Sequence, residues 1–531
     1  MRESTIPLTL CVLSALSVIV SAQTNPPPVE TIAVTAAPPY SAIGELFILR
    51  ADTNRMLLHD PVLVVEGFDI SNDMNWPELY ALLNQENLVD DLQAYGRDLV
   101  VLNFGDSTVD ILANSALTET AVQFINANRA DPGDKFTAVG ASLGGLTIRK
   151  ALVDLPGHDV NTWISFDGPH EGANIPLGVQ EFFEHFSAPG LPGDFDAIRK
   201  FLQALDSPAS RQLLLVHHTH SPDAPAGASS PERQDFVAAM SVAGYPTNCK
   251  SIAISNGSGY GEKLPLNPGQ LVFHWFNDGP FLFGPDLDAD IYALPQSANT
   301  ADIVFRGIFT SILGSVAEGQ TDSCHPLPLD NAPGGYRSTF LQVYTNLPYT
   351  GDGDDLLTAT NHCFIPTVSA LGIPIENIES NLSVHADLLA LSPFDEVHFG
   401  LANEEHVEIN PRNKRWIMRA ALEERDSDGD GYDDYEEYLL GTDYASADSL
   451  PGVYAVVEVA VDISRASLAW GAFPHTQYDV WYAAELGEPW QWMETIPPGT
   501  NSVVTRSYLI DTETPTGFFK IRALVVDPGT D

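Results

Sequence analysis

Apolar runs alternate with helical periodicity through the first part of the chain. Residues 61–65, 98–103, 136–139 and 162–166 form short runs that are rich in apolar residues. Such runs are expected for strands that are buried on both faces of a parallel sheet. Residues 114–130 lie between two of them and carry apolar side chains at helical spacing. The alternation predicts an α/β fold with a doubly wound, mostly parallel sheet, whose ligands bind at the carboxyl ends of its strands.

Three later stretches depart from this alternation. Residues 175–246 carry helical patterns and predict a helical insertion in the sheet. Residues 260–350 are rich in aromatic residues and loop signals and predict no definite element. Residues 450–531 alternate apolar and polar positions between turn residues, which predicts a small, all-β, antiparallel sandwich domain. Four tryptophans of this last stretch suit either its core or a ligand-binding face: Trp470, Trp481, Trp490 and Trp492.

The balance of charges restricts the partners. The 531 residues carry 71 acidic and 25 basic side chains, which gives a net charge of −46. Phosphate groups would be repelled, so the chain is not a general nucleic-acid binder. Docking on an anionic membrane is also disfavoured. The hydrophobic fraction of 44% is typical of a globular protein.

The amino terminus is typical of an exported protein. Residues 1–22 combine a positive start, an apolar run and small residues at the end, and they predict a signal peptide that directs secretion. The run is short for a membrane span, and no transmembrane segment is expected elsewhere. Residues 23–44 are proline-rich and are interpreted as an extended leader. Three cysteines remain in the mature chain, so at most one disulfide forms and its pairing stays open: Cys249, Cys324 and Cys363.

The sequence Gly140-Ala141-Ser142-Leu143-Gly144 follows one apolar run and precedes an amphipathic helix. Gly-X-Ser-X-Gly between a strand and a helix is a nucleophile elbow, a sharp turn that holds the serine hydroxyl clear of the sheet. The flanking glycines let neighbouring backbone approach closely. We therefore expect Ser142 to be a nucleophile and the backbone N–H of Leu143 to point at a developing oxyanion.

Residues 167–174, DGPHEGAN, begin where the strand after the elbow ends. Together with the elbow and the sequence around His406, this turn resembles secreted bacterial lipases and esterases of the α/β-hydrolase fold. The resemblance covers residues 45–420 and implies a helical cap at about 175–246. It also implies a second oxyanion donor after the strand at 61–65, which is the N–H of Phe68 here. Four cap phenylalanines suit either an acyl pocket or an ordinary helix core: Phe182, Phe183, Phe186 and Phe201.

His406 is the expected partner of the serine. It lies in Asn403-Glu404-Glu405-His406-Val407, where an acidic residue, a histidine and an aliphatic run resemble the histidine loop of lipases. Its place in the chain also fits the order Ser, acid, His. A serine hydroxyl becomes a good nucleophile only when an imidazole takes its proton, and the imidazole needs a carboxylate on its other nitrogen.

The carboxylate has three candidates. Many related lipases carry it late in the sheet, where this chain reads Asn361-His362-Cys363 without an acid. Asp167, which ends the strand after the elbow, is the preferred residue. Asp395 is the alternative acid, and Asp354 follows it.

Residues 426–437, DSDGDGYDDYEE, fit the calcium-loop pattern D-x-D-x-D-G-x5-E. With the Gly-Thr-Asp that follows, they resemble the calcium-binding, thrombospondin-type-3-like linkers of secreted bacterial proteins. The linker is expected at 421–449, with a structural Ca²⁺, and no cofactor is expected for catalysis. The expected ligands are five carboxylates and one carbonyl: Asp426, Asp428, Asp430, Tyr432 (through its carbonyl), Asp434 and Glu437.

These patterns together predict a secreted serine hydrolase that cleaves carboxylic esters, a lipase or esterase acting on an ester or lipid substrate. A polyester depolymerase or an acyltransferase would use the same site and stays an alternative. A non-catalytic adhesion or matrix protein is the second alternative. The 450–531 module resembles β modules appended to such secreted enzymes, and we expect it to contact a polymer, a glycan or a cell surface.

Overall fold

The chain divides into two units, residues 1–410 and 411–531. The computed structural model describes residues 26–525 with gaps at 71, 73, 188–195, 222–227, 278–285, 311–315, 348–354, 386–387, 423–424, 430–432, 441, 447–457, 460–464, 472–475, 484–490, 498–502 and 510–517. The predicted signal peptide lies outside the described residues. Among the residues described, no helix is both long enough and apolar enough to cross a membrane.

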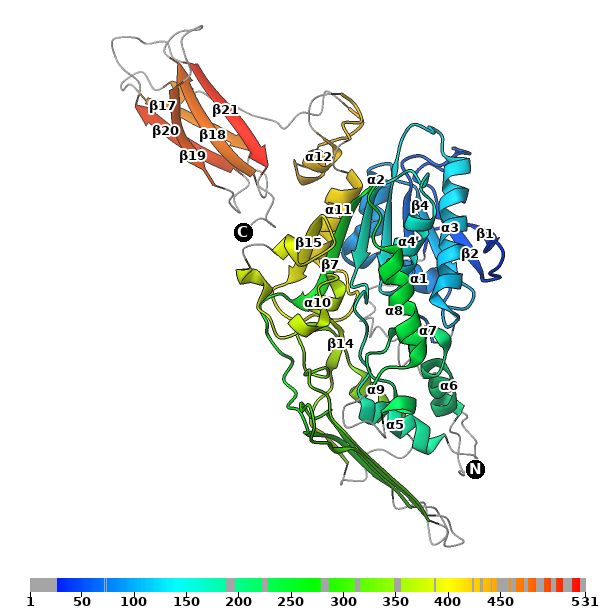
Figure 1. The fold of residues 1–531 in the computed structure, drawn as a ribbon. Helices are drawn as coiled ribbons and strands as arrows, with labels where there is room; N and C mark the ends of the chain where they lie inside the picture. The colour runs from blue at the N-terminus through cyan, green and yellow to red at the C-terminus, as the bar shows by residue number, and fades with distance from the viewer. Residues whose placement is uncertain are drawn as a thin grey trace, which may run out of the picture. The chain divides into compact units, whose positions relative to one another are not determined.

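An eight-stranded sheet forms the centre of the first unit, in the order β1-β2-β4-β3-β5-β6-β7-β15 (Figure 1). The strands from β4 to β15 run parallel, whereas β1 and β2 join antiparallel at one edge. A large, mostly parallel sheet is confirmed. The strand bounds are β1 Glu30–Thr35, β2 Ile43–Leu49, β3 Val62–Val65, β4 Leu99–Phe104, β5 Phe136–Ala141, β6 Val160–Phe166, β7 Lys250–Ser258 and β15 Glu396–Gly400.

Helices α3 (Ile111–Asn128) and α4 (Leu143–Asp154) lie side by side against this sheet. Helix α3 begins at Asp110, whose carboxylate accepts the N–H of Leu112 and so caps the first turn. Helix α1 (Trp76–Leu83) begins with a capping box formed by Asn75 and Glu78. It contacts β2 through Trp76, whose ring lies 5.8 Å from that of Phe47. Helix α2 spans Leu88–Ala94, after the short 3₁₀ turn Gln85–Asn87.

The segment interpreted as a leader contributes an edge strand. Strand β1 pairs with β2 from Glu30 opposite Ile48 to Thr35 opposite Ile43. The strand falls between two proline clusters, at 26–28 and 38–39. Those clusters determined the interpretation of the whole stretch, although residues 30–35 alternate polar and apolar positions as an edge strand does.

A second sheet occupies the region where the sequence predicted no definite element. Its five strands run antiparallel in the order β11-β10-β9-β8-β13. Strands of this sheet form the long narrow arm drawn in green in Figure 1. The bounds are β8 Leu271–Asn277, β9 Asp286–Tyr292, β10 Asp302–Thr310, β11 Val316–Ser323 and β13 Leu356–Leu357.

The predicted insertion contains helices α5 (Leu177–Phe186), α6 (Asp196–Leu205), α7 (Pro208–Leu213) and α8 (Pro231–Ala243). Helix α5 packs against β9, β10 and β11. Its three candidate phenylalanines, and Phe201 of α6, are at most 2% exposed. The Phe182 ring contacts those of Phe273, Trp275 and Phe305 from the second sheet, with centroids 6.2–6.4 Å apart. The phenylalanines therefore form a helix–sheet core.

Shorter elements complete the first unit, and the second unit has helices and strands of its own. The first unit also holds β12 Gly334–Arg337, α9 Thr339–Asn346, β14 His362–Pro366, α10 Thr367–Ala370 and the 3₁₀ turns His218–His220, Ile375–Asn377, Leu382–Val384 and Leu388–Ala390. The second holds α11 Pro411–Leu422, α12 Asp434–Leu440, β16 Glu458–Val459, β17 Arg465–Gly471, β18 Thr476–Ala483, β19 Gln491–Ile496, β20 Val503–Leu509 and β21 Phe518–Val525.

The strands of the second unit form two antiparallel three-stranded sheets, β16-β17-β20 and β19-β18-β21. Trp492 is 55% exposed, so this tryptophan is not a core residue.

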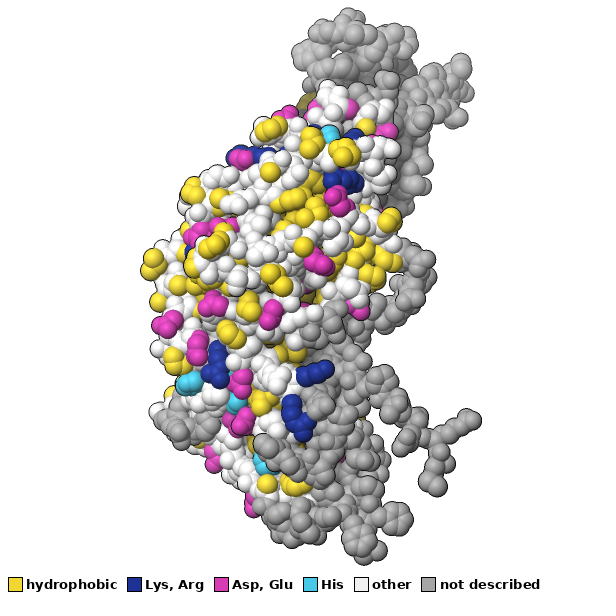
Figure 2. Space-filling view, turned by 90° about the vertical axis from the view of Figure 1, so that its right-hand side faces the viewer, with side chains coloured by type: hydrophobic (Ala, Val, Ile, Leu, Met, Phe, Trp, Pro, Cys, Tyr) yellow, Lys and Arg dark blue, Asp and Glu magenta, His cyan; other side chains and the backbone are white. Residues whose placement is uncertain are grey.

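The surface carries the acidic excess of the composition. On the face shown in Figure 2, acidic side chains are spread among apolar and neutral ones. None of the three cysteines forms a disulfide: Cys249 is half-buried, and Cys324 and Cys363 are buried.

We predict that Phe182→Ala lowers the free energy of unfolding of the first unit by about 3–5 kcal/mol, because it leaves a cavity in the helix–sheet core. The measurement is the urea midpoint of the first unit, followed by tryptophan fluorescence. Val242→Ala is the control, since Val242 is 90% exposed and its truncation removes little packing. A loss below about 1 kcal/mol for Phe182→Ala would contradict the core assignment.

Candidate active site

Ser142 lies on a sharp turn between β5 and α4. Its φ of 52° and ψ of −119° are unusual for a residue with a side chain. The Ser142 N–H donates to the Phe166 carbonyl of β6 at 2.8 Å, which fixes the turn against the neighbouring strand. A methyl group on Gly144 would lie 2.3 Å from the Val65 carbonyl oxygen. Glycine at this position therefore lets α4 start directly against the end of β3.

The loop after β3 runs beside Ser142. A methyl group on Gly67 would lie 3.1 Å from Ser142 Cβ and 3.7 Å from its Oγ. Phe68 follows in this loop, and Leu143 is the first residue of α4. The first N–H groups of a helix have no acceptor within it. Among the described residues, neither the Phe68 nor the Leu143 N–H donates a hydrogen bond, so both are available to a ligand at Ser142.

Asp167 and His406 lie in hydrogen-bond contact, although 239 positions separate them. His406 Nδ1 lies 2.9 Å from Asp167 Oδ2. Asp167 is fully buried and His406 is 1% exposed. Asp167 follows Phe166, the residue that accepts the Ser142 N–H, so the carboxylate and Ser142 leave the sheet at the carboxyl ends of neighbouring strands. The hydrogen bond at Nδ1 leaves Nε2 as the nitrogen for proton transfer.

Backbone from two other elements completes the environment of the carboxylate. Asp167 Oδ1 accepts the Asn256 N–H at 3.0 Å and the Ser255 hydroxyl at 3.3 Å. Its Oδ2 also accepts the Val407 N–H at 3.2 Å. Val407 has a φ of 54° and Asp167 one of 52°. A β-branched residue at positive φ is strained, and the bond to Asp167 is one of the contacts that hold it.

These supporting residues were not identified from the sequence. Ser255 and Asn256 lie in the last part of β7, the strand beside β6. The rule that parallel strands end at one edge could have singled them out. Gly335 of β12 gave no such signal: a methyl group there would lie 2.5 Å from Asp167 Oδ2.

The surroundings of His406 favour the neutral imidazole. Burial lowers the pKa of His406 below its ordinary value, and Asp167 raises it through a hydrogen bond and its charge. The buried Arg337 guanidinium lowers the same pKa further. Phe364 covers the ring at a centroid distance of 4.9 Å. Because burial is the largest effect, His406 is neutral and able to accept a proton at neutral pH.

The hydroxyl of Ser142 makes no hydrogen bond to His406 or to any other described residue. The structure brings the serine turn and the histidine–carboxylate pair to one edge of the sheet without joining Ser142 Oγ to the imidazole. Such bonds are often long before substrate binds.

Asp395, the alternative acid, lies elsewhere. Its Oδ2 accepts both the N–H and the hydroxyl of Ser251 at 2.8 Å. Ser251 is near the start of β7, and Asp395 immediately precedes the parallel strand β15. Asp395 is therefore at the amino edge of the sheet, opposite to Ser142. Asp354 lies outside the described residues.

His170, in the turn DGPHEGAN, is packed among other side chains of the core. Its Nε2 lies 2.8 Å from Ser165 Oγ, and the rings of Trp163, Tyr245 and Phe394 surround it. Burial, followed by the positive charge of Arg149, holds the pKa of His170 well below its ordinary value.

Part of the candidate calcium loop is described in the second unit. Asp434 and Glu437, at the start of α12, are at most 1% exposed. The Asp434 carboxylate accepts the N–H and hydroxyl of Ser427 at 3.0 and 2.9 Å. Asp426 is exposed and Asp428 half-buried. The three remaining positions of the loop lie outside the described residues: Asp430, Gly431 and Tyr432.

No family model and no curated relative matches the chain. Solved structures that match part of it include the mature lipase BlEst2 of Bacillus licheniformis, with 15% identity over 43% of this chain and 72% of that one, at a TM-score of 0.25. Esterase PF2001 of Pyrococcus furiosus matches with 11% identity over 33% of this chain and 61% of that one, at a TM-score of 0.24. Esterase Est22 matches with 14% identity over 30% of this chain and 49% of that one, at a TM-score of 0.23. The chain thus spans about half the length of Est22. These values are too low to place it in their family.

We predict that Asp167→Asn lowers the pKa of His406 further. The Asp167 hydrogen bond and charge both raise that pKa, so their loss favours the neutral ring. The measurement is a chemical-shift titration of protein labelled in its histidines, with His406→Gln identifying the signal. Asp395→Asn is the control and should leave the titration unchanged. An unchanged or higher pKa in Asp167→Asn would contradict the pairing.

Proposed function

We propose that this protein is a serine hydrolase of carboxylic esters, a lipase or esterase, in which Ser142, His406 and Asp167 form the catalytic triad. The observation that supports this proposal most strongly is the buried His406–Asp167 hydrogen bond, at the sheet edge where Ser142 lies on its strained turn. A buried histidine is common in protein cores. A buried imidazole oriented by a carboxylate, beside a serine on a strand-to-helix turn, has the parts that nucleophilic acyl transfer requires.

In the proposed reaction, Ser142 Oγ attacks the ester carbonyl carbon while His406 Nε2 takes the hydroxyl proton. Asp167 holds the ring in the required tautomer through Nδ1 and stabilises the imidazolium. The tetrahedral intermediate collapses by breaking the bond to the alcohol oxygen, which receives the proton from Nε2. Water then attacks the acyl-serine, again with His406 as base, and the carboxylic acid leaves as Ser142 regains its proton.

The developing oxyanion would be stabilised by two backbone N–H groups, those of Phe68 and Leu143. Two points support this assignment: both amides lack an acceptor among the described residues, and the loop that carries Phe68 comes so close to Ser142 at Gly67 that an added methyl group would lie 3.1 Å from Ser142 Cβ. Fixed backbone donors need not reorient when the negative charge develops. Their stabilisation of the oxyanion is therefore a large part of catalysis in such sites.

We predict that Ser142→Ala lowers kcat/KM on p-nitrophenyl esters roughly 10⁶-fold, because the nucleophile is lost. Asp167→Asn should lower it roughly 10⁴-fold, because the imidazole loses the group that orients it. Asp395→Asn removes a carboxylate at the opposite edge of the sheet and should keep the rate within about threefold of wild type. A series of acyl chain lengths separates a lipase from an esterase.

The outcome also decides between the alternatives. If Asp395→Asn falls by orders of magnitude and Asp167→Asn does not, the proposed acid is wrong. Turnover of a solid polyester, or transfer of the acyl group to an added alcohol, would assign the same site to a depolymerase or an acyltransferase. A wild-type protein that hydrolyses no ester and takes no organophosphonate label at Ser142 would favour the non-catalytic adhesion protein.

We further infer that the protein is exported and that its 426–437 loop holds a structural calcium ion. The donor set supports the metal: buried carboxylates at Asp434 and Glu437 belong to one short acidic loop in a chain of net charge −46, and a bound cation would lower the cost of burying them. Oxygen ligands of this kind suit Ca²⁺. When bound, the ion would stiffen the loop and take no part in ester cleavage.

We predict that calcium raises the unfolding midpoint of the second unit, by an amount that corresponds to about 2.7 kcal/mol when calcium is at 100 times its dissociation constant. Glu437→Gln should remove most of this response. Glu436→Gln is the matched control: Glu436 Oε2 accepts the Asp433 N–H, so its loss affects the helix start but not the predicted ligands. Calorimetry with and without a chelator measures the response. Equal responses in both variants would contradict the site.

A further inference from the structure

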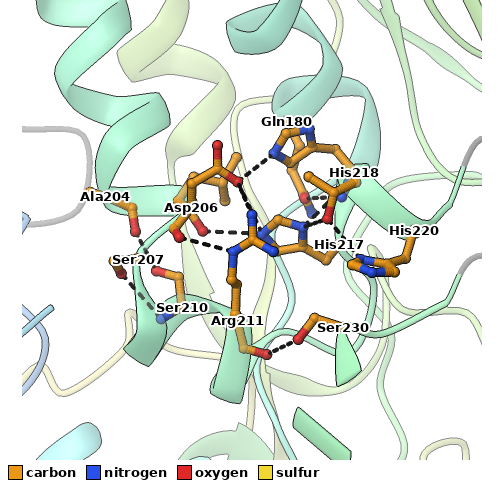
Figure 3. Close-up of polar contacts among 12 residues, drawn as sticks. Gln180, Ala204, Asp206, Ser207, Ser210, Arg211, His217, His218, His220 and Ser230 are labelled. Carbon is orange, nitrogen blue, oxygen red and sulfur yellow. Dashed lines mark hydrogen bonds and ion pairs between the residues drawn. The ribbon is translucent and has the colours of Figure 1, made fainter. Parts of the chain in front are cut away.

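Asp206, His217 and His218 converge in the helical insertion, away from the residues proposed for ester cleavage (Figure 3). Asp206 follows α6, and the histidines lie beside the 3₁₀ turn after α7. One ligand atom from each of the three residues lies within 4.8 Å of the others. The His217 and His218 rings lie 4.7 Å apart, centroid to centroid. Two imidazoles and a carboxylate in one place can hold a metal ion.

The separations between the atoms match those between ligands of a four-coordinate ion. His218 Nε2 lies 3.1 Å and His217 Nε2 lies 3.7 Å from Asp206 Oδ1. With metal–ligand bonds of about 2.0–2.1 Å, tetrahedral ligands lie about 3.3 Å apart. The two separations from Asp206 Oδ1 fall on either side of that value.

The histidines are rigidly held. His217 is fully buried and His218 is 5% exposed. Gln180, itself fully buried, accepts the His218 N–H at 3.0 Å. The same Gln180 side chain donates to the carbonyls of Ile175 and Val216. The His217 N–H donates to Ala228 across the turn. Metal affinity benefits from such preorganisation, because little freedom is lost on binding.

A second layer of hydrogen bonds can set the required tautomer of His217. Its Nδ1 lies 2.8 Å from Thr219 Oγ1, and that oxygen lies 2.7 Å from His220 Nδ1. The Thr219 N–H also reaches Nδ1, at 3.3 Å, and Nε2 lies 3.2 Å from the Leu205 carbonyl oxygen, so without an ion Nδ1 accepts and Nε2–H donates. A metal ion on Nε2 would replace that proton, and the ring would carry its proton on Nδ1 instead, where the Thr219 hydroxyl can accept it. Histidines that bind metals have their other nitrogen hydrogen-bonded in this way.

Arg211 is the competing partner of the carboxylate. Its Nη2 lies 3.1 Å from Asp206 Oδ1, and its Nε donates to the Asp206 carbonyl. A metal ion on Oδ1 would displace this guanidinium group. Glu232 is available to receive it, because Glu232 Oε1 lies 3.7 Å from Arg211 Nη1. Asp206 is 33% exposed, which leaves a path for an ion to enter.

We propose that Asp206, His217 and His218 form a binding site for a divalent transition-metal ion, with Zn²⁺ as the ion that best fits two imidazoles and one carboxylate. Imidazole nitrogen selects such ions over Ca²⁺, which prefers oxygen. The ion would cross-link the end of α6 to the turn after α7 and thereby stiffen the insertion. The proposal does not depend on ester hydrolysis and can fail or succeed separately from it.

The test is zinc binding by the full chain, purified without a histidine tag. Zinc affinity is measured by competition with a chromophoric chelator. Millimolar calcium is present throughout, so that calcium fills the acidic loop of the second unit. We expect one zinc per chain at sub-micromolar affinity. His218→Gln and Asp206→Asn should each weaken it by ~100-fold or more. His385→Gln, which changes an exposed histidine outside the ligand set and its hydrogen bonds, should stay within about threefold of wild type.

Two further readouts separate metal binding from loss of folding. Co²⁺ should give the intense visible absorption of a four-coordinate site in wild type and lose it in Asp206→Asn, whose circular dichroism should remain that of wild type. Arg211→Met should bind zinc at least as tightly as wild type, because the competing cation is removed. Wild type without high-affinity zinc, or equal weakening by His218→Gln and His385→Gln, would overturn the proposal and leave Asp206 as an ion-pair partner of Arg211.

Discussion

The fold around the candidate active site depends on the buried carboxylate of Asp167. An ionised carboxylate without solvent is tolerated only when hydrogen bonds replace its water. Here a hydroxyl and two backbone N–H groups do so from β7 and from the loop after β15, and His406 adds the fourth contact. The carboxylate therefore does more than orient an imidazole. It fixes the end of β7 against the histidine loop, and this requirement accounts for the strained backbone at Val407.

Much of this arrangement could be predicted because it follows from parallel-sheet geometry. Ser142 and Asp167 each end an apolar strand, and neighbouring parallel strands end at one edge. The sequence therefore predicted both positions. The same rule puts Asp395 at the other edge of the sheet, because Asp395 precedes its strand. The contact with His406 could not be derived in this way. It depends on the path of a loop 239 positions away, which no local pattern specifies, so His406 was found through the resemblance of its motif.

The regions that the sequence did not predict were missed for two different physical reasons. A helical period shows which side chains share a face but not what covers that face. The phenylalanines of α5 suited an acyl pocket or a core equally well, and their partners turned out to be strands of the second sheet. Those strands gave no recognisable signal because their turns and aromatic residues resembled a loop. Strand β1 was missed for the opposite reason: prolines on both sides dominated the composition around six alternating residues.

The net charge of −46 does not decide which ion each of the two proposed metal sites binds. A strongly acidic chain attracts all divalent cations through its general field, so attraction alone cannot distinguish calcium from zinc. The distinction must come from the ligands. The loop of the second unit provides oxygen atoms, including buried carboxylates at Asp434 and Glu437, which suit a hard ion. The insertion provides two imidazole nitrogens beside a single carboxylate that Arg211 already neutralises. Arg211 opposes weakly held cations there, so only an ion with strong affinity for imidazole could displace it. In this arrangement the arginine adds selectivity to the proposed zinc site.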